Sequence, residues 1–147
     1  QMAEVAAVIA TGKTVAPRLL LKLNEQTAQA HQGETLDIEL TRIRSGMKAV
    51  VDSGTARTAF AAPELAAIRS GVFAKTGTAE IASGAKQGHG PQAGNVVSFV
   101  GYLAPNFLPD QLHPIAFAVS VSHTERKAGE HAARVMADLL AALATPK

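Results

Sequence analysis

The sequence lacks cysteine and tryptophan altogether, and aromatic residues make up only 4% of it. The absence of cysteine excludes a disulfide framework, a thiolate metal site and a cysteine nucleophile, and it fits a cytoplasmic and a periplasmic protein equally well. Long apolar runs are also missing, because stretches such as residues 115–119 are far shorter than the roughly 18 residues of a membrane-spanning helix. The sequence therefore predicts no membrane span, and the compartment has to come from other features.

An excess of either charge is missing as well. Lys and Arg total 14 against 12 Asp and Glu, a net charge of +2, and the basic residues form no stripe. We therefore expect no nucleic-acid partner. The five histidines show no metal-ligand spacing, so no metal site is expected either. What the chain does have is apolar character: 47% hydrophobic residues over 147 positions argue against disorder and for one ordinary domain, or a piece of one.

The first predicted element is a helix at the very start of the chain. Apolar residues recur there at helical spacing and stop at Gly12, which is typical of a helix that ends in a glycine. No N-capping residue precedes the apolar face. We therefore expect the chain to begin inside an element and to be a fragment of a longer protein.

The rest of the N-terminal half alternates between periodic and polar segments. Two-residue alternation predicts a short strand over residues 15–23, and a polar, glutamine-rich loop follows over residues 24–34. Helical spacing of apolar residues from Leu36 to Val51 predicts a second helix that ends near residues 53–54. The alanine-rich residues 56–69 predict either a loose turn or a short helix.

The C-terminal half is dominated by strands. β-leaning or alternating apolar residues predict three consecutive strands, at residues 71–79, 96–103 and 115–121. A final helix is predicted from an apolar stripe made of Ala132, Val135, Met136, Leu139, Leu140 and Leu143. Segregated in this way, the elements predict the α+β class, an antiparallel sheet of three consecutive strands with packed helices.

The most specific motif is Lys75-Thr76-Gly77-Thr78, on the first of the three consecutive strands. Such a strand can bind an anionic substrate along its edge, because Lys75 supplies positive charge and Thr76 and Thr78 supply hydroxyls. Gly77, which has no side chain, lets a ligand approach the backbone. The alternative is an ordinary exposed strand with a lysine that extends into solvent. Short motifs discriminate weakly, so these residues alone leave both interpretations open.

The Lys-Thr-Gly triplet resembles the third signature of the serine β-lactamase and penicillin-binding protein superfamily. The similarity continues in chain order. Residues 1–20 resemble the family's helix-turn-strand, and residues 45–56 resemble its helix that ends in Gly-Thr-Ala. Residues 98–105 and 115–122 resemble two later strands, and a C-terminal helix follows. Residues 1–147 are thereby identified as the C-terminal segment of a penicillin-binding protein transpeptidase domain, with a partial β-lactamase/transpeptidase-like fold. The Thr-Ala-Glu after Gly77 is closer to the class B type. One departure is Ala74, where the family usually has glycine.

The resemblance implies a role for each residue of the motif. Lys75 would contribute to the electrostatics of the active site, and Thr76 and Thr78, with Gly77 between them, would hold the carboxylate of the substrate or of a β-lactam. The backbone N–H of Thr78 would form half of an oxyanion hole. The family's S-x-x-K nucleophile and its S-x-N region would lie upstream of residue 1, so the isolated fragment is expected to be inactive.

The implied activity is D,D-transpeptidation in peptidoglycan synthesis. A serine attacks the D-Ala-D-Ala stem peptide, D-Ala leaves, and an amine from a neighbouring stem peptide resolves the acyl-enzyme; β-lactam antibiotics acylate the same serine. No metal or organic cofactor is implied. The resemblance places the parent protein at the periplasmic face of the bacterial inner membrane, held by an anchor. The last strand would lack its neighbours, so we expect it to pair with the N-terminal part of the same domain or with a second copy.

Two alternatives to a transpeptidase remain open. The first is a noncatalytic peptidoglycan-binding or interaction module that kept the Lys-Thr-Gly wall; the upstream sequence would distinguish it from the enzyme. The second is a fragment of a β-lactamase, which would differ by fast deacylation.

A literal S-x-x-K occurs at Ser45 and Lys48, which would share a helix face. We do not interpret it as the nucleophile site. Met47 lies on the apolar stripe, so Ser45 and Lys48 are expected to point toward solvent, the spacing to Lys75 is far shorter than in the family, and no S-x-N occurs in the chain.

Overall fold

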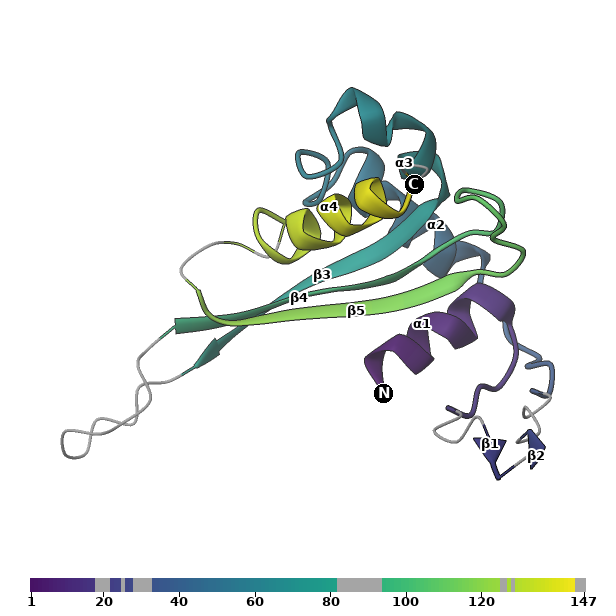
Figure 1. The fold of residues 1–147 in the computed structure, drawn as a ribbon. Coiled ribbons are helices and arrows are strands. Elements are labelled where there is room, and N and C mark those ends of the chain that lie inside the picture. Colours follow the sequence, from purple (N-terminus) through teal and green to yellow (C-terminus); the bar gives the residue numbers. More distant parts are fainter. Residues whose placement is uncertain are drawn as a thin grey trace, which may run out of the picture.

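The structure is a computed structural model, and it describes residues 1–17, 22–24, 26–27, 33–81, 94–124, 127 and 129–144. Its centre is an antiparallel sheet in the order β3-β4-β5, made of β3 (Val72–Ile81), β4 (Gly94–Leu103) and β5 (Ile115–Thr124) (Figure 1). The three predicted strands and the α+β class are thereby confirmed, and the strand ends differ from the predicted ranges by at most three residues. The glycine-rich residues 83–93, which connect the first two strands, lie outside the described residues.

Helices cover both faces of this sheet (Figure 1). On one face lies α4 (Ala132–Ala144), accompanied by the short helices η1 (Pro63–Leu65) and α3 (Ala66–Gly71). On the other face lie α1 (Met2–Thr11) and α2 (Thr41–Asp52). Residues 56–69, for which the sequence predicted either a loose turn or a short helix, contain both: a run of turns is followed by η1 and α3.

The core lies on the α4 face of the sheet and is centred on β4. Phe99 has no exposed surface, and its ring lies 6.0 Å from that of Phe60 and 5.6 Å from that of Phe117. Ala133 and Ala137 of α4 are fully buried in the same cluster. Because alanine is small, it lets the helix lie close to the aromatic layer. This packing holds β4 in place, and the unbroken pairing of β4 with β3 holds the strand that carries the motif.

Before α2, the prediction of a short strand over residues 15–23 is wrong for residues 15–17. Residues 14–17 have no regular structure, and only β1 (Lys22–Leu23) is a strand, paired with β2 (Gln26–Thr27) inside the predicted loop; residues 18–21 lie outside the described part. Pro17 has no N–H to donate to a neighbouring strand. The predicted strand is therefore absent at residues 15–17 and present at residues 22–23.

The second helix begins later than predicted, at Thr41. The backbone N–H of Leu36 donates to the carbonyl oxygen of Gly12 at 2.9 Å, and that of Thr14 donates to the carbonyl of Glu34 at 2.8 Å. These bonds hold residues 34–36 in an extended conformation beside the end of α1. Their backbone groups are therefore used in bonds to residues 12–14 and not in a helix. The predicted end is confirmed, because α2 stops at Asp52.

The final helix is confirmed, but only half of its predicted stripe is buried. Its buried residues include Ala132, Met136 and Leu140. The other half, Val135, Leu139 and Leu143, is 45–52% exposed. The stripe spans a wider arc than the sheet covers, because residues at i and i+3 lie on neighbouring lines of a helix. No helix in the described part of the chain is both long enough and apolar enough to cross a membrane.

Tyr102 is the chain's one tyrosine, and it provides a measure of how well the sheet excludes water. It is 4% exposed, and its ring stacks on that of Phe73, its partner across β3 and β4, at a centroid distance of 4.9 Å. Burial raises the pKa of Tyr102, and the positive charge of Arg44 offsets part of this increase. We expect ultraviolet titration of the phenolate to give a midpoint above the ordinary tyrosine pKa of about 10.

The raised pKa of Tyr102 also makes the free energy of unfolding depend on pH in the alkaline range. The unfolded chain releases the Tyr102 proton at a lower pH than the folded chain does, so stability is retained below the ordinary tyrosine pKa and falls as pH rises from there through the folded-state pKa. Tyr102→Phe should abolish both the phenolate signal and this part of the alkaline loss. A midpoint at or below the ordinary value would contradict the burial of the hydroxyl.

Candidate functional site

The four residues of the Lys-Thr-Gly-Thr motif lie along β3, which is an edge strand among the described strands. Side chains alternate between the faces of a strand. Lys75 and Gly77 accordingly border a cavity under α1 and α2, whereas Thr76 and Thr78 border a second cavity near the start of the turn that follows α2. Thr76 borders both. The motif thus contributes side chains to two cavities, one on each face of β3.

The first cavity has a volume of about 580 Å³ and is largely apolar. The helices supply its walls, mainly Met2, Val5, Ala6, Ile9, Ile43, Met47 and Val50. Lys75 brings positive charge to its floor: the side chain is exposed, and Nζ donates a hydrogen bond to the carbonyl oxygen of Thr76 at 2.5 Å. Arg42 adds a second cationic side chain to the lining. A ligand with an apolar body and an anionic group fits this combination of apolar walls and positive charge.

Gly77 faces Ser98 directly across the sheet, in the register of β3 and β4. A Cβ atom at position 77 would lie 2.6 Å from Ser98 Oγ. A side chain at position 77 would therefore force the Ser98 hydroxyl to move, in addition to obstructing a ligand. Ser98 belongs to no motif in the sequence, and only the strand register reveals its position opposite Gly77.

On the opposite face, Thr76 is joined to Thr55. The two Oγ1 atoms are 2.7 Å apart, within hydrogen-bonding distance, although the residues are separated by 21 positions in the sequence. Thr76 is 9% exposed, whereas Thr55 is exposed. Thr55 belongs to the Gly-Thr-Ala turn that follows α2, so this turn brings a hydroxyl to the back of the motif. Sequence reasoning matched the turn to a family pattern but gave Thr55 no role.

The Thr55–Thr76 pair forms part of the second cavity, of about 350 Å³. Its lining is unusually rich in hydroxyls and carries one cation and one anion: Thr55, Thr58, Thr76, Thr78, Lys127, Gly129 and Glu130. Hydroxyls arranged around a small space can donate hydrogen bonds to a carboxylate. The opposite charges of Lys127 and Glu130 offset each other, so recognition of an anion depends on the hydroxyls.

Gly129 fixes the position of Thr55 from the other side. A Cβ atom at residue 129 would lie 1.8 Å from the carbonyl oxygen of Thr55, so only glycine permits this approach. The N–H of Ala56 also donates to the carbonyl of Val50 at 3.0 Å, which ties the turn to the end of α2. Thr55 is therefore held by the fold itself.

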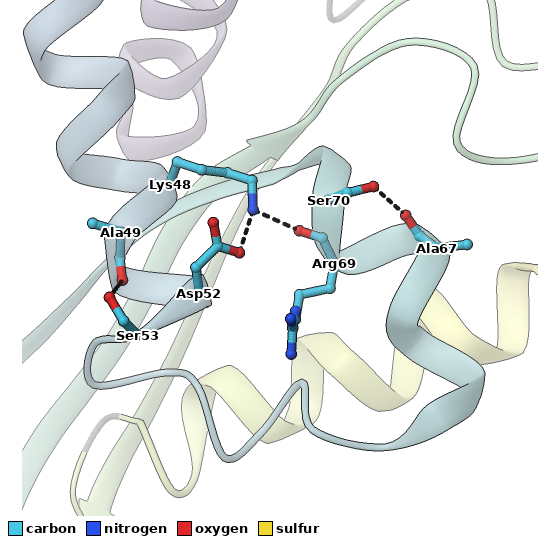
Figure 2. Close-up of polar contacts among 7 residues, drawn as sticks. All are labelled: Lys48, Ala49, Asp52, Ser53, Ala67, Arg69 and Ser70. Atoms are coloured by element: carbon cyan, nitrogen blue, oxygen red, sulfur yellow. Dashed lines mark hydrogen bonds and ion pairs between the residues drawn. The ribbon is translucent and has the colours of Figure 1, made fainter.

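The literal S-x-x-K at Ser45 and Lys48 has a structural use. Figure 2 shows the Lys48 side chain extended toward Asp52 and the main chain of Arg69. Its Nζ donates to the Asp52 carboxylate and, at 3.2 Å, to the carbonyl oxygen of Arg69, which links α2 to α3. The expectation of a solvated face is correct for Ser45 but wrong for Lys48, whose side chain is 23% exposed.

This geometry supports our interpretation of Ser45 as an ordinary surface serine. A lysine that activates a serine has to accept the serine proton. Lys48 instead donates to two oxygens on other residues, the Asp52 carboxylate and the Arg69 carbonyl. Among the described residues, no group of three or more His, Asp or Glu side chains is arranged to hold a metal ion.

The family model for the penicillin binding protein transpeptidase domain matches residues 1–141. No curated protein and no solved structure matched the chain.

Proposed function

Because the chain belongs to the penicillin-binding protein transpeptidase family, a family of cell-wall transpeptidases, we propose that β3 is one wall of the active site of a serine D,D-transpeptidase. The observation that carries the proposal is the position of the motif on an edge strand, with an ammonium toward an apolar cavity and two hydroxyls toward a polar one. A strand of this kind offers both charge and hydrogen-bond donors to one bound peptide.

Each residue of the motif has a role in the proposal. Thr76 and Thr78 donate hydrogen bonds to the terminal carboxylate of the D-Ala-D-Ala stem peptide or to the carboxylate of a β-lactam. Gly77 keeps the edge of β3 open to the ligand. Lys75 stabilises negative charge that develops during acyl transfer, and the backbone N–H of Thr78 is one of the two donors to the oxyanion.

The nucleophile belongs to a segment outside these 147 residues in this proposal. The serine Oγ of that segment attacks the carbonyl carbon of the penultimate D-Ala, and the bond to the terminal D-Ala breaks as its nitrogen takes up a proton. The amine of a second stem peptide then attacks the ester and releases the serine, so no redox partner or organic cofactor is needed. A β-lactam would acylate the same serine, and its ring nitrogen would take the proton.

The partners and the location follow from this activity. Peptidoglycan is assembled outside the cytoplasmic membrane, so we place the protein at the periplasmic face, held there by an anchor elsewhere in the protein. The N-terminal part of the same domain would bring the serine to β3 and would supply neighbours for β5. Alone, the chain would be inactive, because acyl transfer needs the serine, its activating lysine and the oxyanion donors together.

The proposal can be tested by intact mass after incubation with benzylpenicillin, for the chain alone and for the chain with the S-x-x-K-bearing segment of the same protein. We expect a penicilloyl adduct only in the mixture, on the added segment. Lys75→Met should lower the acylation rate about 10²-fold, the usual cost of losing one electrostatic stabiliser. Lys22→Met, which removes an exposed lysine on β1, is the matched control and should leave the rate unchanged.

The contrary outcomes are equally clear. An adduct on the isolated chain that disappears in Ser45→Ala would mean that Ser45 is reactive. No adduct in the mixture, with both parts folded, would favour a noncatalytic peptidoglycan-binding module. Rapid loss of the adduct would favour a β-lactamase.

A further inference from the structure

We propose that Thr55 is a positioning residue that sets the direction in which the Thr76 hydroxyl donates its hydrogen, and that it thereby makes the site prefer ligands with a carboxylate. This inference rests on the proposed role of Thr76 as a carboxylate donor. Nothing in the Lys-Thr-Gly-Thr motif itself points to Thr55, which reaches the site from the turn after α2.

The Thr55–Thr76 contact contains two hydroxyl hydrogens, but only one of them can lie between the two oxygens. Each hydroxyl has one hydrogen and two acceptor positions, so only one of the two can donate across the 2.7 Å between their Oγ1 atoms. If Thr76 donates to Thr55, Thr76 offers only lone pairs to the cavity, and these repel a carboxylate. If Thr55 donates to Thr76, the hydrogen of Thr76 is free to point at the ligand.

Burial makes the second arrangement the favourable one when an anion is bound. Thr76 is 9% exposed and has little access to water, whereas Thr55 is exposed, and water can reach its lone pairs when its hydrogen is used. A chain of donors from Thr55 through Thr76 to a carboxylate also strengthens each bond in it, by about 10–30%. The contact therefore favours an anionic acceptor over a neutral one.

Both hydroxyl oxygens are already in place before a ligand arrives. Thr76 is β-branched, so its χ1 angle has few alternatives within a strand, and only the hydroxyl hydrogen turns freely. Thr55 is held by the close approach of Gly129 to its carbonyl oxygen and by the bond from Ala56 to Val50. Binding of a carboxylate thus needs a rotation of two hydrogens and no movement of the chain, which keeps its cost low.

Other charges in the cavity do not provide the same selectivity. Lys127 attracts an anion and Glu130 repels it, and both line the cavity that contains Thr55 and Thr76. Their effects on a carboxylate oppose each other. The preference for a carboxylate over an equally shaped neutral group is therefore assigned to the hydroxyls: Thr78 donates directly, and the Thr55–Thr76 pair sets the direction in which Thr76 donates.

The test uses the chain together with the S-x-x-K-bearing segment and compares benzylpenicillin with its methyl ester, which lacks the carboxylate charge. Thr55→Val keeps the shape and removes the hydroxyl. We expect it to lower the acylation rate by benzylpenicillin about tenfold, the size of effect that loss of one hydrogen bond to a charged group produces, and to change the rate with the ester less than about twofold. Thr55→Ser should restore the preference.

Thr41→Val is the matched control, because Thr41 is exposed at the far end of α2, about 16 Å along the helix axis from its last residue. It should leave both rates unchanged. Equal losses with benzylpenicillin and its ester in Thr55→Val would show a merely structural role and would overturn the inference. So would an unchanged ratio of the two rates, or a serine variant that fails to rescue.

A second measurement separates this inference from the proposed function. The 147-residue chain is titrated with N-acetyl-D-alanine and with N-acetyl-D-alaninamide while the amide resonances of Thr76 and Thr78 are followed by NMR. We expect Thr55→Val to weaken binding of the acid about tenfold and to leave binding of the amide unchanged. This result would support the role of Thr55 even if the mixture gave no acylation. Equal binding of the acid to both proteins, or no response at Thr76 and Thr78, would overturn it.

Discussion

Gly101→Ala is expected to lower the free energy of unfolding by about 3 kcal/mol, the upper end of the usual range for overpacking. A Cβ atom at this position would lie 2.1 Å from the carbonyl oxygen of Phe73 and 2.7 Å from the Cα atom of Ala74. Both atoms belong to the backbone of β3, which cannot move aside as a side chain can. The strands would have to separate immediately before Lys75, so we expect ligand binding to weaken as well.

Urea denaturation monitored by circular dichroism measures this effect, and Gly46→Ala is the matched control. Gly46 lies in the middle of α2, and a Cβ atom there meets no described atom within 4 Å. The same chemical change should therefore raise stability by about 0.5–1 kcal/mol, because alanine favours the helix. Similar effects of the two substitutions would contradict the strand register.

The register also explains why glycine suits position 101, opposite Ala74. Ala74 is fully buried and lies directly opposite Gly101. Its methyl group occupies the space that a Cβ atom at position 101 would need, since the two Cβ atoms would be 2.6 Å apart. Ala74→Gly should therefore relieve Gly101→Ala only in part, because the contact with the Phe73 carbonyl remains.

Phe99→Ala is expected to lower the free energy of unfolding by about 4 kcal/mol, within the usual range for removing a buried phenylalanine. The Phe99 ring is fully buried and packs against that of Phe60, from the segment after α2, and that of Phe117, from β5. Its loss removes contacts to both and leaves a cavity that the sheet and α4 cannot close without moving.

The measurement is again chemical denaturation, with Leu112→Ala as the comparison. Leu112 is 75% exposed in the connection before β5, so its truncation should change stability by less than about 0.5 kcal/mol. Phe99→Leu should give a smaller loss than Phe99→Ala because it fills part of the space. Comparable losses at positions 99 and 112 would mean that the core does not depend on this aromatic layer.

The elements that could be predicted from the sequence are those that bury one face and whose form is determined by their own residues. β4 alternates between the buried Val97 and Phe99 and more exposed neighbours, and α1 ends at Gly12, whose φ of 70° lies in the left-handed region. In each case, the residues that determine the element lie within it. The start of α2 could not be predicted in this way, because it depends on pairing between Leu36 and Gly12 that no local pattern reports.

The candidate site shows the same division. The motif on β3 was visible in the sequence, and two-residue alternation applied to the motif itself would already have separated Lys75 from Thr76. The Thr55–Thr76 bond and the contact of Gly77 with Ser98 could not be foreseen, because each joins residues from different elements through the tertiary fold. The width of the buried face of α4 depends in the same way on how far the sheet extends.

The direct junction of α3 and β3 constrains how this part of the gene can vary in length. α3 ends at Gly71 and β3 begins at Val72, with no linker between them. Gly71 is held by the N–H of Ala104, which donates to its carbonyl at 2.8 Å, and by the ring of Phe107, which fills the space of a side chain. An inserted or deleted codon here would turn every following side chain of β3 to the opposite face and exchange the surroundings of Lys75 and Thr76. Homologous proteins should therefore tolerate length changes in the loops beyond the strands far better than at this junction.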